Sequence, residues 1–374
     1  MRILVTGGAG FIGSHTADAL LDLGHEVRIL DALTPPVHAE RRFPEHLRER
    51  GAECVEGDVR DREAWEKALD GVDAVYHLAA YQDYLPDFST FFTTNTVSTA
   101  LMYEVLVARG QPCSRVIVAS SQAVYGEGAY SCPACPALRE LRPGPRARER
   151  LDRGLWDLPC PSCETALEPV WTDESATRPH NSYALSKHGE ESLALMLGDR
   201  YGIPTVALRY SIVQGARQSF RNAYSGVLRI FSQRVINGRA PLCYEDGRQL
   251  RDYVSVHDVT RANVLVLGDD RAVGRAFNVG GARRVSIRDY AALVIRAAGA
   301  NCEPEIVGSY RVGDTRHVLS STEALQALGW RPVVELPDVV DEYLSWVASQ
   351  PDFRDVTSEA DNRMYALGTL RRTR

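Results

Sequence analysis

The chain has 374 residues, of which 44% are hydrophobic and 25% charged. It can therefore bury a large core, and its length suggests two domains or one large domain with an appendage. The net charge of −6 argues against binding to nucleic acid or to a membrane surface. No run of about 18 apolar residues occurs, and the N-terminus lacks the features of a signal peptide. We therefore expect a cytoplasmic protein.

Short apolar runs alternate with helical patterns through the first 210 residues. Strands are predicted at 2–5, 26–31, 53–55, 74–79 and 115–120, and helices at 11–21, 62–69 and 97–107. This alternation indicates βαβ units, so the predicted fold class is α/β with a doubly wound parallel sheet of the Rossmann type.

The domain organisation follows from where this alternation changes. Residues 1–210 are predicted to bind a dinucleotide, interrupted by an insert at 127–171 that is rich in Pro, Arg and Cys. Residues 211–352 are patterned less regularly and are predicted to form mainly a smaller substrate-binding domain, interleaved with the first. Residues 353–374 are polar and weakly patterned, which favours a loose tail over a partner contact.

A glycine-rich segment lies directly between the first strand and the first helix. Gly7, Gly10 and Gly13 would let the backbone turn tightly, approach a pyrophosphate and pack the helix on the sheet. Asp31 ends the next strand, where a carboxylate can bind ribose hydroxyls and would repel a 2′-phosphate. The pattern predicts an NAD site, with a purely structural turn as the alternative.

A second signal combines a helix start with a strand end. Tyr183 and Lys187 are four residues apart and share one helical face, where an ammonium group can stabilise a phenolate. Most patterns of this kind are exposed amphipathic helices. The serine pair Ser120-Ser121 at the end of an apolar strand favours catalysis, because ligands in such sheets bind at the carboxyl ends of the strands.

These motifs resemble the extended short-chain dehydrogenases/reductases, in the branch of NAD-dependent nucleotide-sugar epimerases and dehydratases. The resemblance covers nearly the whole chain except the insert and the tail. The matching segments, in order, are Thr6–Gly13, Asp31, Gly57–Val59, His77–Ala80, Ser120–Gly126, Tyr183 with Lys187, Leu208–Tyr210, Arg251–Val254 and Gly313–Asp314.

The resemblance implies roles for individual residues. Tyr183 would be the catalytic base, Lys187 would bridge the nicotinamide ribose, and Ser121 would bind the sugar oxygen that is oxidised, whereas Ser120 would be structural. The implied NAD-binding residues are Gly7, Gly10, Phe11, Ile12, Gly13, Asp31, Asp58, Val59, Leu78, Ala79, Ala80, Tyr183 and Lys187. The implied substrate-binding residues are Ser121, Gln122, Asn222, Arg251 and Arg311, although surface ion pairing is an alternative for the two arginines.

The reaction implied by the resemblance is epimerisation of a nucleotide-diphosphate sugar, at C4 through a transient 4-keto intermediate. Dehydratases of the family usually place an Asp-Glu pair after the catalytic serine or threonine, and this chain has Gln122-Ala123 there. A ketoreductase, dehydratase or decarboxylase on the same fold remains an alternative. A noncatalytic NAD-binding scaffold is an alternative of another class.

Two Cys-x-x-Cys pairs lie in the insert, at Cys132/Cys135 and Cys160/Cys163. Four thiolates satisfy tetrahedral zinc and leave no open position, so the pattern predicts a structural zinc site, with redox dithiols or incidental cysteines as alternatives. The arginine run between the pairs is expected to be a solvated face, and a nucleotide or partner contact is a lesser alternative.

Three further expectations rest on the resemblance. Cysteine pairs at this place are similar to those of a family subset assigned as dTDP-L-rhamnose 4-epimerases, which points to deoxysugar nucleotides. The family's asparagine that contacts the substrate diphosphate is Ile212 here, so an atypical substrate pose is expected. Helices near 96–108 and 183–200 match those that pair in related dimers, which predicts a homodimer.

Overall fold

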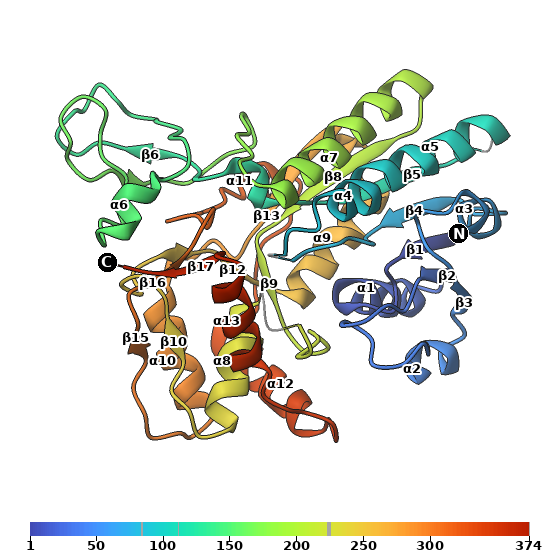
Figure 1. Ribbon diagram of the computed structural model, residues 1–374. Helices are drawn as coiled ribbons and strands as arrows, with labels where there is room; N and C mark the ends of the chain where they lie inside the picture. The colour runs from blue at the N-terminus through green and yellow to red at the C-terminus, as the bar shows by residue number, and fades with distance from the viewer. Residues whose placement is uncertain (84, 111, 223–225, 374) are drawn as a thin grey trace.

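A computed structural model describes residues 1–83, 85–110, 112–222 and 226–373 (Figure 1). Its centre is a seven-stranded sheet in the order β13-β8-β5-β4-β1-β2-β3, and every neighbouring pair is parallel. The strands are β1 (Arg2–Thr6), β2 (Glu26–Asp31), β3 (Glu53–Glu56), β4 (Ala74–His77), β5 (Arg115–Ser121), β8 (Thr205–Tyr210) and β13 (Arg275–Val279). The predicted α/β fold class is confirmed.

Helices cover both faces of this sheet, which explains why its central strands are apolar throughout. On one face α1 (Phe11–Asp22) and α9 (Val256–Gly268) pack against alternate residues of β1 such as Ile3 and Val5. On the other, α3 (Arg62–Ala68), α5 (Ser98–Arg109) and α7 (Ser182–Tyr201) pack against residues such as Leu4. A π-helical turn (Phe92–Val97) leads from α4 (Phe88–Phe91) into α5, and the small α2 (Glu45–Glu49) lies beside α1.

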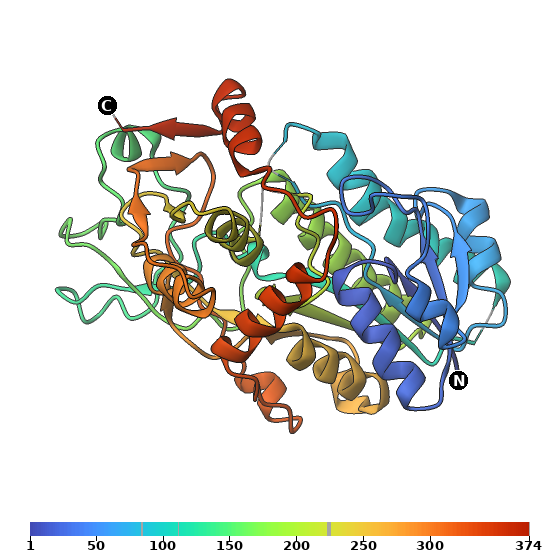
Figure 2. The ribbon, with the colours of Figure 1, turned by 90° about the horizontal axis from the view of Figure 1, so that it is seen from below.

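The C-terminal half contributes to two bodies. Its β13 belongs to the main sheet and α9 packs against that sheet, whereas α8 (Val227–Ile236), α10 (Ile287–Ala297) and α12 (Leu336–Ala348) share a separate core. Figures 1 and 2 show these three helices grouped to one side of the sheet. The accompanying short elements are β9 (Ile212–Gln214), β10 (Leu242–Cys243), β11 (Leu250–Arg251), β12 (Tyr253–Ser255), β14 (Val285–Ser286), β15 (Glu305–Ile306), β16 (Ser309–Arg311) and α11 (Glu323–Gln326).

The C-terminal segment is ordered, so the expectation of a loose tail is wrong. It forms α13 (Thr357–Ala366) and β17 (Leu370–Arg372), and β17 pairs antiparallel with β16. Met364 and Leu370 expose 0% and 1% of their surface. A few buried apolar side chains and one strand pairing are enough to dock a polar segment, and such sparse anchors leave little periodicity in the sequence.

The predicted insert projects from the body of the protein, at the upper left of Figure 1. It contains an antiparallel pair, β6 (Tyr130–Ser131) with β7 (Glu168–Pro169), and one short helix, α6 (Arg148–Asp152). Its own core is small and includes two cysteines among its five buried members, which are Tyr130, Cys132, Leu158, Cys160 and Leu167. A core of this size needs a covalent or metal cross-link to be stable by itself.

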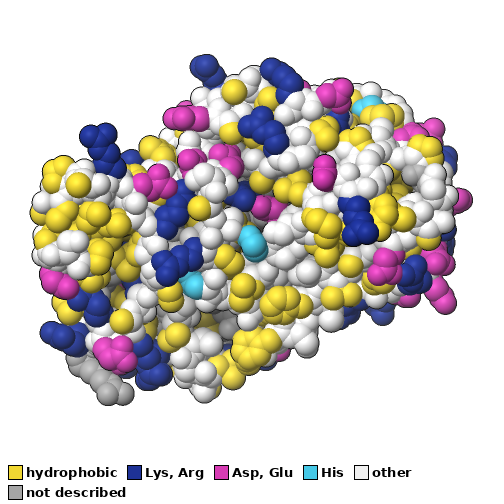
Figure 3. Space-filling model, turned by 90° about the horizontal axis from the view of Figure 1, so that it is seen from above, with side chains coloured by type: hydrophobic (Ala, Val, Ile, Leu, Met, Phe, Trp, Pro, Cys, Tyr) yellow, Lys and Arg dark blue, Asp and Glu magenta, His cyan; other side chains and the backbone are white. Residues whose placement is uncertain are grey.

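The surface carries charges of both signs. On the face shown in Figure 3 basic and acidic side chains are interspersed, and hydrophobic side chains gather at the left-hand end, where the insert lies. The arginine run of the insert is only partly the solvated face that we expected: Arg148 exposes 52% of its side chain, but Arg142 exposes 19% and Arg146 only 3%. Among the helices that the structure describes, none combines the length and the apolar character that a membrane crossing requires.

Candidate active site

A cavity of about 930 Å³ opens at the carboxyl ends of β1, β4 and β5 and extends to the C-terminal helices and loops. The predicted NAD-binding, catalytic and substrate-binding residues all line it, although they come from segments as distant as Gly7 and Arg311. The structure thus brings the predicted residues together in one place. Their individual roles stay predictions.

The glycine turn has the shape that a dinucleotide needs. Gly7 has φ +66°, and a Cβ atom on it would lie 2.8 Å from the backbone nitrogen of Ala79. A Cβ on Gly13 would lie 2.1 Å from the Gly7 carbonyl oxygen. The start of α1 lines the cavity beside this turn, and the first N–H groups of a helix have no intrahelical acceptor. The glycines therefore leave a close approach for a diphosphate at a helix N-terminus.

Two acidic residues predicted to bind the adenosine half also hold the backbone. Asp31 accepts hydrogen bonds from the backbone nitrogens of Ala9 (3.0 Å) and Leu33 (2.9 Å), so its carboxylate braces the glycine turn. Asp58 faces the guanidinium of Arg60, with contacts of 2.6 to 3.1 Å. Burial acts to raise the pKa of Asp58, but the hydrogen bonds from Arg60 outweigh it, so the pKa is lowered and the carboxylate form is favoured.

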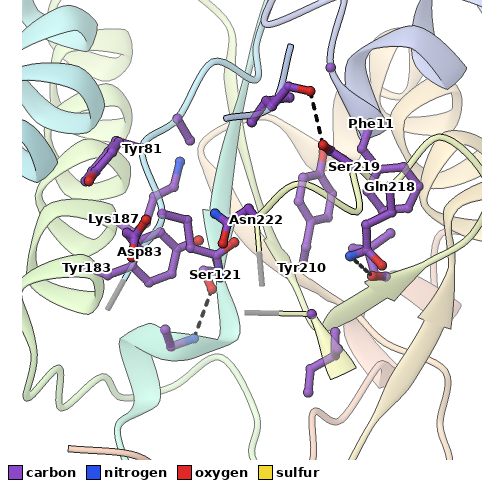
Figure 4. A pocket seen from close by; sticks show the side chains of 18 of the residues that line it. Phe11, Tyr81, Asp83, Ser121, Tyr183, Lys187, Tyr210, Gln218, Ser219 and Asn222 are labelled. Carbon is purple, nitrogen blue, oxygen red and sulfur yellow. Dashed lines mark hydrogen bonds between the residues drawn. The ribbon is translucent and has the colours of Figure 1, made fainter. Parts of the chain in front are cut away.

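The proposed catalytic side chains come from α7 and the end of β5. The side chain of Asn181 caps α7 by accepting from the Ala184 nitrogen (2.8 Å), which fixes the first turn that carries Tyr183. Figure 4 shows Tyr183, Lys187 and Ser121 on one side of the cavity. The Ser121 hydroxyl oxygen accepts from a backbone N–H two residues on (3.2 Å). This arrangement fits a base, a cation and a hydroxyl around one substrate oxygen.

The neighbouring Ser120 has a structural position, as the resemblance implied. Its hydroxyl is buried and donates to Glu191 at 2.5 Å. Glu191 in turn accepts two hydrogen bonds from Arg209 of β8, at 2.9 and 2.6 Å. These hydrogen bonds between Ser120, Glu191 and Arg209 connect α7 to β5 and β8 and so fix the position of α7 on the sheet.

Sequence reasoning missed the buried carboxylate of Glu190, which contacts Lys187. Lys187 Nζ donates to the carbonyl of Ala119 and to Glu190 Oε2, both at 2.7 Å, and Glu190 exposes 0% of its surface. Burial, partly opposed by Lys187, raises the pKa of Glu190 to about 7. The i,i+3 spacing on α7 is the signal that could have found this pair.

The end of the cavity away from the glycine turn is lined by arginines, including Arg251 and Arg311. Arg251 donates to the carbonyls of Thr315 (2.8 Å) and Arg316 (2.9 Å), and it forms an ion pair with Asp314 at 3.7 Å. The guanidinium of Arg311 lies 5.0 Å from the centre of the Tyr244 ring. Arg251 is buried and Arg311 is partly exposed, and both side chains line the cavity.

Two more side chains of the cavity, those of Gln122 and Arg229, have polar groups inside the protein. Gln122 Oε1 is buried and has no hydrogen-bond partner among the described residues. Arg229, from α8, lines the cavity, exposes 8% of its surface and donates to the Ser219 carbonyl at 3.0 Å. No motif pointed to Arg229, because only the packing of α8 brings it to the cavity. Ile212, which replaces the family's asparagine, also lines the cavity.

The four cysteines of the insert converge as predicted. Their sulfur atoms all lie within 4.8 Å of one another, and Cys163 Sγ lies 3.5 Å from Cys132 Sγ and 3.4 Å from Cys135 Sγ. All eight cysteine thiols, which lie within the described residues, are free. A tetrahedral zinc with Zn–S bonds of about 2.3 Å requires sulfur separations of about 3.8 Å, so the cluster has the size and chemistry of such a site.

Comparison with known sequences decides the family. A sequence model of the NAD dependent epimerase/dehydratase family matches residues 3–146 and 162–280. The chain belongs to this family. The break in the match, residues 147–161, falls within the insert and includes Cys160.

Relatives within the epimerase/dehydratase family include enzymes of both kinds. The chain is 33% identical to a dTDP-L-rhamnose 4-epimerase of Burkholderia thailandensis, over 94% of this chain and 96% of the relative. It is 29% identical to a dTDP-glucose 4,6-dehydratase of Streptomyces griseus, over 92% and 93%. The fold is similar to UDP-glucose 4-epimerase of Thermotoga maritima with UDP-glucose (TM-score 0.75, 26% identity, 93% and 99% covered). It is also similar to the Thermus thermophilus UDP-glucose 4-epimerase with NAD (TM-score 0.71, 29% identity, 93% and 99% covered).

Proposed function

We propose that this protein is an NAD-dependent epimerase of a nucleotide-diphosphate sugar, acting at C4. The observation that carries the proposal is the single cavity that joins the glycine turn, Ser121, Tyr183 and Lys187 to the arginines at its far end. A noncatalytic NAD-binding scaffold has no need for a base, a cation and a hydroxyl in one pocket. The dinucleotide would lie along the glycine turn, and the sugar diphosphate toward Asn222, Arg251 and Arg311.

The residues divide the chemistry between them. NAD, when bound along the glycine turn, would supply the hydride acceptor for oxidation at C4 and the hydride donor for the reverse step. Tyr183, as phenolate, takes the proton of the C4 hydroxyl, and the ammonium of Lys187 stabilises the negative form of the phenol. The Ser121 hydroxyl hydrogen-bonds the same sugar oxygen and favours its oxidised, 4-keto state. When the keto sugar turns over in the pocket, Tyr183 gives the proton back to the oxygen, and the product differs only in its C4 configuration.

Epimerisation is favoured over dehydration by the residues next to Ser121. Elimination of water requires an acid and a base beyond the tyrosine, and the amide of Gln122 and the methyl of Ala123 supply neither. The buried, unpartnered Oε1 of Gln122 in the described structure suits a hydrogen bond to the sugar instead. The relative in Burkholderia thailandensis is named a dTDP-L-rhamnose 4-epimerase, so deoxysugar nucleotides are the first class of substrate to test.

The test uses the enzyme as purified, without added cofactor. dTDP-L-rhamnose, dTDP-glucose, UDP-glucose and UDP-N-acetylglucosamine are incubated separately in D₂O, and the C4 configuration is followed by NMR. We expect inversion at C4 of one of them with retention of the C4 hydrogen, because the hydride returns to the carbon it left. Stoichiometric NADH consumption would indicate a ketoreductase, and a 4-keto-6-deoxy product a dehydratase. No reaction with a broad panel, despite bound NAD, would favour a scaffold.

For the insert we propose a structural zinc ion held by Cys132, Cys135, Cys160 and Cys163. The support is the convergence of the four thiols and the small core around them. With four sulfur ligands zinc would have no open position, so its contribution is to fold the insert. Elemental analysis of protein never exposed to chelator should give about one zinc per chain.

We also propose a cytoplasmic homodimer that pairs through α5 and α7. Apolar side chains stand exposed on α7 (Leu185, 47%; Met196, 51%), on the turn before α5 (Phe92, 39%; Val97, 46%) and on α5 itself (Val107, 38%). Side chains of this size on two neighbouring helices support burial against a second copy. Light scattering of the wild type and of Leu185→Glu with Met196→Glu tests it: a dimer for the first and a monomer for the second is the expected result, and a monomeric wild type would refute it.

A further inference from the structure

The arginines of the insert differ sharply in how they are used. Arg148 exposes 52% of its side chain and forms an ion pair with Asp152 at 4.0 Å. Arg146, two residues earlier, exposes 3%. A guanidinium removed from water to this degree needs partners for its charge and its N–H groups. The partners of Arg146 therefore show which segments outside the insert it contacts.

Arg146 forms a two-pronged ion pair with Glu245, which lies outside the insert. Its two terminal nitrogens donate to the two carboxylate oxygens at 2.9 and 2.8 Å, and the Glu245 side chain is 2% exposed. Glu245 has φ +54°, in the left-handed region that side-chain-bearing residues seldom adopt. The fork of Arg146 thus stabilises a backbone conformation that needs support from its surroundings.

The conformation of Glu245 matters because of its neighbour. Tyr244 lines the cavity, and its ring lies under the guanidinium of Arg311 at 5.0 Å. A change of backbone at Glu245 would move that ring, and with it the surface on which Arg311 rests. Arg146 therefore acts on one of the two arginines at the substrate end, although it is itself absent from the cavity lining.

A second contact reaches the other arginine. Arg146 also donates to the carbonyl of Asp314 at 2.9 Å. Asp314 and the next residue, Thr315, line the cavity, and the Thr315 carbonyl accepts from Arg251 at 2.8 Å. The loop that follows Arg311 is thereby fixed by the insert on its outer side and holds Arg251 on its inner side.

The insert supplies one more link to the same loop. Arg316, 2% exposed, donates to Asp157 of the insert at 2.7 Å and to Glu245 at 3.0 Å. Its backbone nitrogen donates to Glu127 at 2.7 Å, and Glu127 follows the catalytic segment that begins at Ser121. The two arginines and the three acidic residues of this group therefore pair with one another: Arg146 with Glu127 and Glu245, and Arg316 with Asp157 and Glu245.

We propose that Arg146 is a positioning residue for substrate binding: the insert, through this side chain, sets the geometry of the loop and ring that orient Arg251 and Arg311 toward the substrate diphosphate. The proposal rests on the proposed function, since it takes the ligand to be a nucleoside-diphosphate derivative. It assigns the insert a part in recognition beyond its own folding. The dinucleotide end of the cavity is untouched by these contacts.

The experiment compares Arg146→Ala and Arg146→Lys with Arg148→Ala as the matched control, all as full-length enzyme with its NAD. Binding of dTDP and of UDP is measured by calorimetry, together with NAD content, melting temperature, kcat and KM. For Arg146→Ala we expect Kd and KM to rise by about tenfold or more, with unchanged NAD content and a kcat within about twofold of wild type. Arg146→Lys keeps the charge but loses the fork, so an intermediate rise is expected. Arg148→Ala should match the wild type.

The outcomes separate this proposal from the proposed function. If the wild type binds neither dTDP nor UDP, the nucleotide-sugar function itself is wrong. If the wild type binds one of them and both Arg146 variants bind it equally well, the positioning role is refuted, whatever their melting temperatures. If Arg146→Ala does not fold, Arg146→Lys decides alone: unchanged Kd with a lowered melting temperature would mean a purely structural role.

Discussion

The buried carboxyl group of Glu190, beside Lys187, gives a quantitative prediction about pH. Glu190 is 0% exposed, accepts a hydrogen bond from Lys187 at 2.7 Å, and its other oxygen has no partner in the described part of the chain. Burial raises its pKa from 4.5 to about 7, against the opposing effect of Lys187. Glu190→Gln keeps the size and an acceptor oxygen but cannot ionise.

The sign and size of the effect follow from this pKa. Below pH 4.5 the carboxyl group is protonated in both the folded and the unfolded chain. As the pH rises from 4.5 to 7, the unfolded chain releases the proton while the folded protein keeps it, so the stability due to the raised pKa is lost across this window. Each pKa unit corresponds to about 1.4 kcal/mol, so the wild type should lose about 3 kcal/mol that Glu190→Gln does not lose.

Urea unfolding at pH 5 and pH 8 measures this difference. The free energy of unfolding of the wild type should fall by about 2 to 3 kcal/mol more than that of Glu190→Gln between the two pH values. Glu66→Gln, at an exposed position of α3, is the control and should follow the wild type. Parallel pH dependence of the wild type and Glu190→Gln would refute the reasoning, because it would mean that Glu190 has the same pKa in both states.

Three further predictions concern the site and the insert. Tyr183→Phe should lower turnover by a factor of about 10² to 10⁴ and retain NAD, measured by kcat and by the NAD released on acid denaturation; unchanged turnover would remove Tyr183 as the base. Gly13→Ala places a Cβ 2.1 Å from the Gly7 oxygen, so the purified variant should contain little NAD, whereas full occupancy would contradict the tight turn. Cys163→Ser should lose most of its zinc and make the insert sensitive to limited proteolysis, while a variant with full zinc content would show that the metal has other ligands.

The parts of the fold that could be predicted from sequence are those with local signals. The strand that ends at Asp31 is an apolar run because it is buried, and the glycine turn is recognisable by its composition. Both signals lie in short continuous segments of the chain. The placement of Ser121 and Tyr183 at one cavity was predictable for a related reason. Ser121 ends a strand and Tyr183 begins a helix, and in a parallel sheet both positions fall on the same edge.

The features that were missed depend on contacts between distant segments. Arg146 lies in a run of similar residues, and its contacts with Glu245, 99 residues away, and with Asp314 distinguish it from the exposed Arg148. The docking of Met364 and the pairing of β17 with β16 are equally long-range, so the C-terminal segment reads as a tail. Glu190 is the exception, because its spacing from Lys187 was visible and its burial was not.

Arg146 does not line the cavity, but the position of the insert in the chain explains how its contacts can reach the loops that do. It leaves the body after the catalytic segment of β5 and returns before α7, at the carboxyl edge of the sheet, where loops lengthen without disturbing the strand pairing. Its return is fixed to the substrate loop region, since Thr172 donates its backbone N–H to the Leu319 carbonyl at 2.8 Å. A module rooted there is already within reach of the substrate-binding loops. Contacts such as those of Arg146 can therefore act on the loop after Arg311, while the sheet fixes the glycine turn and the start of α7 independently of the insert.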